Sequence, residues 1–208
     1  MPDPAHPYDG VPPGQWAAVT KKIIKDHPLG TDEIVSSVLA AWKDLHASVL
    51  GRKLRIGKDI FPNPQIIGFL LHELIPAELA DKHPGKWRRE KTKAEKDLVY
   101  IPDAKYSVEI KTSSHKTSIF GNRSYAQLSA SGRLSNKARS GYFLTVNFQA
   151  AKTADEEGKI TRIRFGWLDP TDWIGQTAQT GQQSRLTTDA DRKKLVQLYP
   201  VIAKAKAG

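Results

Sequence analysis

The 208-residue sequence has no cysteine, no long apolar run and no leader-like start. Without cysteine there is no disulfide framework, thiolate metal site or thiol nucleophile, which excludes the class of small disulfide-stabilised secreted domains. The longest apolar run, IIGFLL, is too short to cross a bilayer. The opening MPDPAHPYDGVPPG is rich in proline and lacks the basic and apolar regions of a signal peptide. We therefore expect a cytoplasmic protein that is not associated with a membrane.

Acidic residues are scarce relative to basic ones. Lys and Arg total 32 against 22 Asp and Glu, a formal net charge of +10. Such a balance is typical of a protein that binds nucleic acid or another anionic surface. Charge alone does not identify the polyanion, and a basic domain without such a partner remains the alternative.

The length fits one domain with a substantial core. We expect a flexible arm over residues 1–14, because its prolines remove backbone donors and it has no periodic apolar face. A single domain then covers 15–208. It divides into a helical part at 15–82, a catalytic core at 83–175 and a C-terminal helical or loop part at 176–208.

Helical periodicity predicts three helices in the first half of the chain. The first begins near Trp16, and the second begins at Thr31, which we interpret as its N-cap. The third covers PQIIGFLLHEL and ends before Pro76, which has no N–H to continue the helix.

Four short strand signals follow: DLVYI, YSVEIK, GYFLTVNFQ and KITRIRFGWL. A polar segment between the second and third, GNRSYAQLSASGRLSNKARS, is long enough to hold a helix. The order of helices and strands indicates a mixed α/β (α+β) fold, in which a central mixed β-sheet is flanked by helices and preceded by an N-terminal helical region.

The first two strand segments bring acidic side chains together. The hairpin register that gathers the apolar side chains on one face places Leu98 opposite Val108 and leaves 102–104 as the loop. Asp97 then lies opposite Glu109. A slip by one residue would scatter the apolar side chains over both faces. Opposed carboxylates repel unless a cation lies between them.

Oxygen donors with no histidine or cysteine nearby favour a hard cation, Mg²⁺, with one or two ions per site. The predicted ligands are the carboxylates of Asp97 and Glu109 and the backbone carbonyl of Ile110. Lys111 shares a strand face with Glu109 and would orient water or stabilise charge on a phosphate. We interpret Asp103 as a turn residue of the Pro-Asp loop. A surface hairpin with a structural ion pair remains the alternative, because E-x-K alone is a weak motif.

A basic run, KHPGKWRREKTKAEK, leads into this hairpin. We predict that Lys86, Arg88 and Arg89 form a cationic strip beside the catalytic cleft. Charge runs are more often solvated faces, which is the alternative interpretation.

Asp97, Glu109 and Lys111 resemble the signature of the PD-(D/E)xK nuclease superfamily, an acid at the start of one strand and (D/E)-x-K on the next. The chain departs from the pattern at Lys96, where the signature has proline, while the literal Pro102-Asp103 lies too close to Glu109. The segments VEIKTSSHKTSIFGNRSYAQ, GYFLTVNF, IRFGWLDPTDWIGQ and TGQQSRL resemble the ScaI-type group of type II restriction endonucleases.

This resemblance implies a restriction-endonuclease-like core and a homodimeric, Mg²⁺-dependent enzyme. Such an enzyme cuts double-stranded DNA at a short palindrome and leaves 5′-phosphate ends. A cognate DNA methyltransferase is expected as a neighbouring gene, not as a bound subunit.

The resemblance also suggests Glu73 as the helix glutamate that many members of the superfamily place near the metal, although an exposed helix-end acid is equally consistent. Further residues have side chains suited to phosphate or base contacts. These DNA-binding candidates are Ser113, Ser114, His115, Asn122, Arg123, Ser124, Tyr125, Gln127, Gln182, Gln183 and Arg185. Ordinary polar loops are the alternative.

Two other functions remain open from the sequence. One is a structure-selective or exonucleolytic nuclease of the same superfamily, such as a junction resolvase. The other is a DNA-binding module in which the acids and the lysine form only a structural ion pair.

Overall fold

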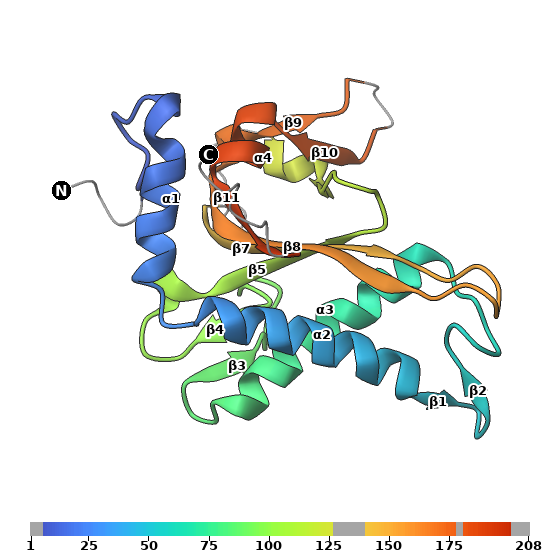
Figure 1. Cartoon of the computed structure of the whole chain (residues 1–208). Coiled ribbons are helices and arrows are strands. Elements are labelled where there is room, and N and C mark those ends of the chain that lie inside the picture. Colours follow the sequence, from blue (N-terminus) through green and yellow to red (C-terminus); the bar gives the residue numbers. More distant parts are fainter. Residues whose placement is uncertain (1–5, 127–139, 178–180, 201–208) are drawn as a thin grey trace, which may run out of the picture.

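The structure is a computed structural model that describes residues 6–126, 140–177 and 181–200. Its centre is a six-stranded mixed sheet with the strand order β11-β8-β7-β5-β4-β3 (Figure 1). β5 and β7 pair in parallel, and the other neighbours in this sheet pair antiparallel. The strands are β3 (Trp87–Arg89), β4 (Leu98–Tyr100), β5 (Val108–Ser113), β7 (Gly141–Gln149), β8 (Lys159–Leu168) and β11 (Leu195–Tyr199). The predicted mixed α/β class and the four predicted strands are confirmed.

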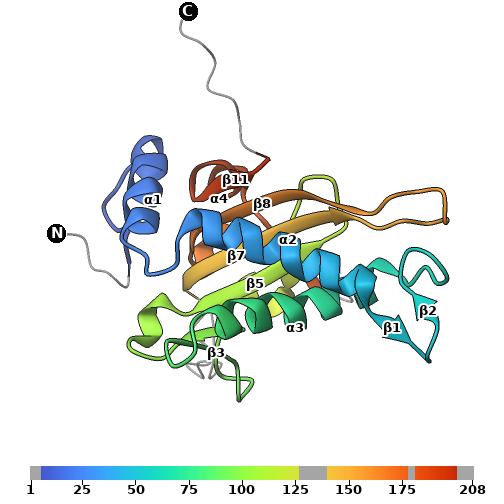
Figure 2. The same cartoon turned by 60° about the horizontal axis from the view of Figure 1, so that its bottom comes forward.

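Two long helices cover one face of this sheet, α2 (Thr31–Ala47) and α3 (Pro64–Lys82) (Figure 2). Their buried side chains, such as Val38 and Leu71, meet apolar side chains of the strands, such as Ile110 and Val146, in the main core. A further helix, α1 (Trp16–Lys25), packs beside β8 and β11. No helix in the described ranges is long and apolar enough to cross a membrane.

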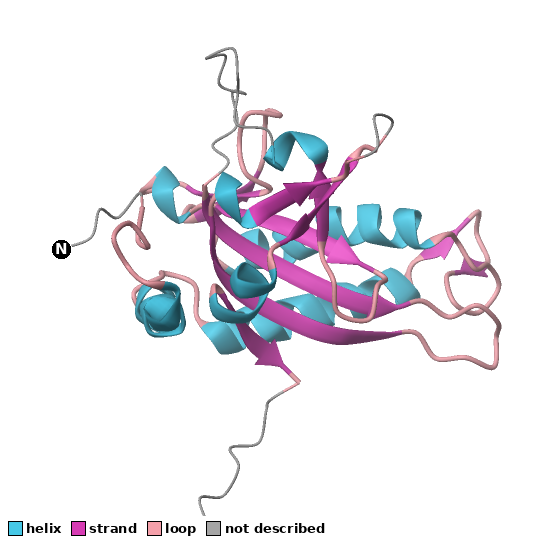
Figure 3. Cartoon of the chain, turned by 90° about the horizontal axis from the view of Figure 1, so that it is seen from above, coloured by secondary structure: helices cyan, strands magenta, loops and turns pink. Residues whose placement is uncertain are grey.

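The other face of the sheet carries a second, smaller sheet with the order β6-β10-β9 (Figure 3). Its strands are β6 (Phe120–Asn122), β9 (Trp173–Gly175) and β10 (Gln183–Leu186). A separate apolar cluster that includes Phe143, Trp173 and Leu186 joins the two sheets. The central sheet is therefore packed on both sides.

Short elements connect these parts of the fold. They are η1 (Pro13–Gln15), β1 (Val49–Leu50), β2 (Leu54–Arg55), η2 (Ala104–Tyr106), η3 (Arg123–Ala126), η4 (Pro170–Asp172) and α4 (Thr188–Lys193). The polar segment in which a helix was expected contains β6 and η3, and its residues 127–139 lie outside the described part of the chain.

The prediction that the third helix ends before Pro76 is wrong, because α3 continues to Lys82. Pro76 has no N–H to donate to the carbonyl of His72, so the helix loses one backbone hydrogen bond there. Pro76 itself, Ile75 and Leu79 are buried, and this packing holds the helix through the break. Tertiary packing has therefore overridden a local stop signal.

Both ends of the N-terminal region also differ from the prediction. Gly30 is the N-cap of α2, and Thr31 is its first helical residue. Order begins before Trp16, because Tyr8 is only 7% exposed and its hydroxyl lies 2.8 Å from Oγ1 of Thr20. The Tyr8 ring also lies 4.1 Å from Nζ of Lys194. Apolar and cation–π contacts thus hold residues that a proline-rich pattern suggested were a loose arm.

Candidate active site

The E-x-K pair lies in β5, at the centre of the sheet. Val108 and Ile110 point into the main core, so the alternation of the strand turns Glu109 and Lys111 to the opposite face. Nζ of Lys111 lies 2.6 Å from Oε1 of Glu109. Glu109 is only 2% exposed, whereas Lys111 lines an open cleft. The pair therefore consists of a buried carboxylate and an ammonium group at the cleft.

Asp97 lies at the edge of β5, immediately before β4. The predicted pairing of Leu98 with Val108 is confirmed, and it is the one register pair between β4 and β5. Beyond it, the Ile110 N–H donates a hydrogen bond of 2.6 Å to Oδ2 of Asp97. In a strand, the N–H and C=O of one residue point to the same side. The Ile110 carbonyl therefore faces the edge at which Asp97 lies.

The rest of the hairpin differs from the prediction. The loop is longer than 102–104, because the backbone N–H of Tyr100 donates to Oγ of Ser107 instead of joining a longer ladder, and η2 fills the turn. Asp103 caps η2 by accepting a hydrogen bond from the Lys105 N–H. This contact agrees with its interpretation as a turn residue.

His72 of α3 also reaches this edge, with Nδ1 3.8 Å from Oδ2 of Asp97. The expectation of no histidine near the carboxylates is wrong. His72 is one turn after Gly68, where α3 lies close enough to β5 for Thr112 to contact the Gly68 carbonyl, but this approach is seen only in the structure. The helix face that carries Gly68 is thus the one that faces the catalytic strand.

Glu73 is the neighbour of His72 but makes a different contact. It forms an ion pair with Arg89 of β3, and both side chains are about half exposed. Arg88 likewise pairs with Glu95, with one nitrogen at 3.0 Å. Lys86 is exposed. Two of the three predicted cationic residues are therefore engaged by carboxylates at the rim of the fold.

Tyr125 of η3 was predicted to contact DNA, but its hydroxyl donates a hydrogen bond of 2.6 Å to Oε1 of Glu109. Nζ of Lys111 lies 5.1 Å from the centre of the Tyr125 ring. The structure thus brings a third side chain to the E-x-K pair, from a segment that sequence spacing did not connect with it.

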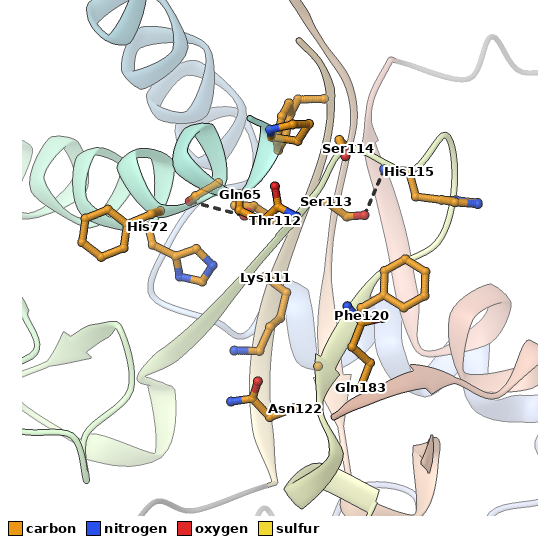
Figure 4. A pocket seen from close by; sticks show the side chains of 15 residues that line it. Gln65, His72, Lys111, Thr112, Ser113, Ser114, His115, Phe120, Asn122 and Gln183 are labelled. Carbon is orange, nitrogen blue, oxygen red and sulfur yellow. Dashed lines mark hydrogen bonds between the residues drawn. The ribbon is translucent and has the colours of Figure 1, made fainter. Parts of the chain in front are cut away.

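A cleft of about 850 Å³ opens beside this cluster, between the start of α3, the end of β5 and the small sheet (Figure 4). His72 and Lys111 line it together with polar residues that the sequence had singled out. Five predicted DNA contacts lie along its wall: Ser113, Ser114, His115, Asn122 and Gln183. The ring of His115 is held by its own loop, because Nδ1 accepts hydrogen bonds from the N–H groups of Thr117 and Ser118.

The remaining DNA-contact candidates lie elsewhere. Gln182 and Arg185 line an adjoining hollow of about 740 Å³ on the small sheet, which Gln183 also borders. Arg123 donates to the Gly181 carbonyl at 3.2 Å. Ser124 lies in η3. Gln127 is outside the described residues.

The oxygen donors on and beside β5 are of the type that a hard cation prefers. Among the described residues, no three histidine, aspartate or glutamate side chains gather into a metal-binding group. Two carboxylates and one carbonyl nonetheless suit Mg²⁺, which is commonly held by one or two carboxylates and keeps several of its waters. The residues present are therefore compatible with the expected ion.

Comparison with known proteins identifies relatives of the whole chain. The family model described as ScaI restriction endonuclease matches residues 6–199. The type II restriction enzyme ScaI of Streptomyces caespitosus is 46% identical over 196 residues, which are 93% of this chain and 84% of that protein. No solved structure matches the chain significantly.

Proposed function

The chain belongs to the ScaI restriction endonuclease family and is a type II restriction endonuclease, and we propose that Asp97, Glu109 and Lys111 form its catalytic centre. The observation that carries the assignment is that Glu109 and Lys111 share one face of β5 while Asp97 binds the backbone of the residue between them. Lys111 Nζ is 2.6 Å from Glu109, and the Asp97 carboxylate is bonded to the backbone of the residue between them in sequence.

The Asp97 and Glu109 carboxylates and the Ile110 carbonyl would hold one or two Mg²⁺ ions. When bound, such an ion supplies a more acidic water and offsets the negative charge that builds on the phosphate. The protein's own part is to hold the carboxylates in place, which the Ile110 N–H does for Asp97 and the Lys111 ammonium does for Glu109.

Lys111 acts on the reacting groups. An ammonium has three N–H donors, and one is used by Glu109. The others are available to orient the attacking water and a phosphate oxygen in the cleft. The water oxygen forms the new bond to phosphorus in line with the departing 3′ oxygen. The bond between phosphorus and the 3′ oxygen breaks, which leaves a 5′-phosphate. The attacking water releases a proton to solvent, and the 3′ oxygen takes up a proton from solvent to become a hydroxyl.

Double-stranded DNA lies along the cleft, where Ser113, His115, Asn122 and Gln183 are within reach of its backbone and bases. The net charge of +10 favours the encounter. A symmetric homodimer places one catalytic centre on each strand of a short palindrome. The enzyme acts in the cytoplasm, beside a cognate methyltransferase that protects the host sequence.

Incubation of plasmid DNA with the enzyme, with Mg²⁺ or with EDTA, tests the assignment. We expect the enzyme to produce discrete fragments with 5′-phosphate ends when Mg²⁺ is present, and no fragments when EDTA is present. The Glu109→Ala variant should bind DNA without cutting it, whereas Asp103→Asn, in the same hairpin, should cut normally.

Two results would contradict this proposal. Cleavage of ends or branches without a fixed ladder would favour a structure-selective nuclease. Unchanged cleavage by the Glu109→Ala variant would show that the Glu109–Lys111 pair is only a structural contact.

A further inference from the structure

Lys111 and Tyr125, both among the described residues, donate hydrogen bonds to Oε1 of Glu109. One comes from the Lys111 ammonium and one from the Tyr125 hydroxyl, each at 2.6 Å. Hydrogen bonds to an ionised oxygen at this distance are among the stronger ones in proteins. The orientation of the Glu109 carboxylate therefore depends on Tyr125 as well as on its neighbour in β5.

The Tyr125 ring comes from η3, directly after β6, and packs between the two sheets. It lies 5.3 Å from the Trp173 ring of β9 and 6.2 Å from the Phe143 ring of β7. Gly121 of β6 makes room for it, because a Cβ on Gly121 would lie 3.2 Å from Cδ2 of Tyr125. Tyr125 thus spans the gap between the small sheet and the buried carboxylate.

The same small sheet forms a wall of the cleft. Asn122 and Gln183 are register partners in β6 and β10, and both side chains line the cleft. The backbone just before Tyr125 is fixed to this wall, because the Arg123 N–H donates to the Gln182 carbonyl at 2.8 Å. A duplex that contacts Asn122 and Gln183 would therefore shift the backbone segment that carries Tyr125 and so change the position of the Tyr125 hydroxyl.

We propose that Tyr125 is a positioning residue that holds the Glu109 carboxylate and couples it to the β6-β10-β9 sheet, so that cleavage depends on how DNA is seated on that sheet. The inference rests on the proposed function, in which Glu109 is catalytic. It assigns Tyr125 an intramolecular role in place of the DNA contact expected from its sequence context.

The Tyr125→Phe variant tests this role because it removes the hydroxyl and keeps the ring in its packing. We expect kcat on the cognate site to fall about 10- to 100-fold, the range of a lost hydrogen bond to a charged group. The Kd for DNA without metal should stay within about twofold, since the cleft wall is unchanged. The rise in Tm on addition of Ca²⁺ should be smaller, because a less fixed Glu109 holds a cation less well.

Discrimination between the cognate site and a mismatched site is the measurement that would not change if Tyr125 had only a structural role. In the wild type, a duplex seated wrongly on the small sheet would displace Tyr125 and with it the Glu109 carboxylate that Tyr125 holds. The ratio of cleavage rates between the cognate site and a site with one mismatch should therefore fall in Tyr125→Phe toward the ratio of binding affinities. An unchanged ratio would overturn the coupling.

Two further variants separate the possible failures. Tyr142→Phe removes the hydroxyl of another buried tyrosine, which contacts the Ile23 carbonyl on the helical side of the sheet, and should leave rate and discrimination unchanged. If Glu109→Ala cuts normally, the proposed function itself fails. If Glu109→Ala is inactive but Tyr125→Phe has wild-type rate and Ca²⁺ response, only the role of Tyr125 is refuted.

Discussion

Lys111 Nζ lies 2.6 Å from Glu109 Oε1, with the side chains 14% and 2% exposed. A carboxylate this deeply buried is stable as an anion only with a cation or several donors beside it. The two side chains therefore depend on each other, because loss of the lysine leaves a buried carboxylate without its cation, and loss of the glutamate leaves the ammonium without its acceptor.

We predict that Lys111→Met lowers the single-turnover cleavage rate by roughly 10²- to 10⁴-fold, the usual contribution of a positioned proton-transfer or electrostatic group. Glu109→Gln, which keeps the volume of the side chain, should be equally inactive. DNA affinity should be retained in both variants, and removal of the carboxylate charge should, if anything, strengthen it. A gel-shift titration in EDTA beside the cleavage assay measures both quantities.

Glu73 and Asp97 should differ sharply in their importance for cleavage. Glu73 forms a half-exposed ion pair with Arg89, and such pairs contribute about 0–1 kcal/mol. We expect Glu73→Gln to keep cleavage close to the wild-type rate, because its carboxylate is engaged by Arg89 and loss of this pair costs little stability. Asp97→Asn should instead abolish cleavage at any practical Mg²⁺ concentration. If both substitutions were equally damaging, Glu73 would belong to the catalytic centre as the family resemblance suggested.

His27 should make the fold sensitive to mild acid. It is 6% exposed, and its Nδ1 accepts from the Leu29 N–H at 3.2 Å while Nε2 contacts the Tyr106 carbonyl at 3.0 Å, so the ring is held in its neutral form. Burial lowers the pKa of His27 from 6.5 to about 4. In the unfolded chain His27 therefore becomes protonated below pH 6.5, whereas in the folded chain it becomes protonated only near pH 4.

The stabilising contribution of neutral His27 is thus complete above pH 6.5 and declines as the pH falls toward 4. The full effect is about 3 kcal/mol. Urea denaturation at several pH values should show the wild type losing stability across this window. His27→Gln should start less stable but lose less on acidification. An equal slope for both proteins would show that other groups control the acid response.

Lys194 should be essential for folding stability. Its ammonium lies 2.9 Å from Asp172 and 3.2 Å from Asp169, and the residue is 3% exposed. Lys194→Met leaves two carboxylates without this cation, and we expect a loss of about 3–5 kcal/mol in the free energy of unfolding.

Addition of Asp172→Asn to this variant should restore part of the loss of stability. The adjacent Lys193→Met is the matched control, because Lys193 forms only a surface ion pair with Asp189 and should change stability by less than about 1 kcal/mol.

Sequence patterns within one strand or one hairpin were sufficient to predict how the residues at the centre of the site are arranged. Alternation placed Glu109 and Lys111 on one face of β5, and the apolar register placed Leu98 opposite Val108. These relations depend on residues that are close in sequence and on side-chain periods that the backbone fixes. They could therefore be read without knowledge of the rest of the fold.

Contacts between distant segments could not be predicted in this way. His72 precedes Asp97 by 25 positions, and Tyr125 follows Glu109 by 16, as the residue numbers show. Periodicity shows which face of an element is buried but not which element covers it. The small sheet is also built from strands of three or four residues, which are too short to show a clear alternation.

Gly68 lies where α3 crosses β5, and a Cβ there would be 2.9 Å from Oγ1 of Thr112. The helix and the strand approach closely because Gly68 has no side chain, and they are also the two walls that carry His72 and Lys111. The distance between these two walls of the cleft thus depends on the absence of a side chain at Gly68. A larger residue at this position would push α3 away from β5 and so would separate His72 from Lys111 across the cleft.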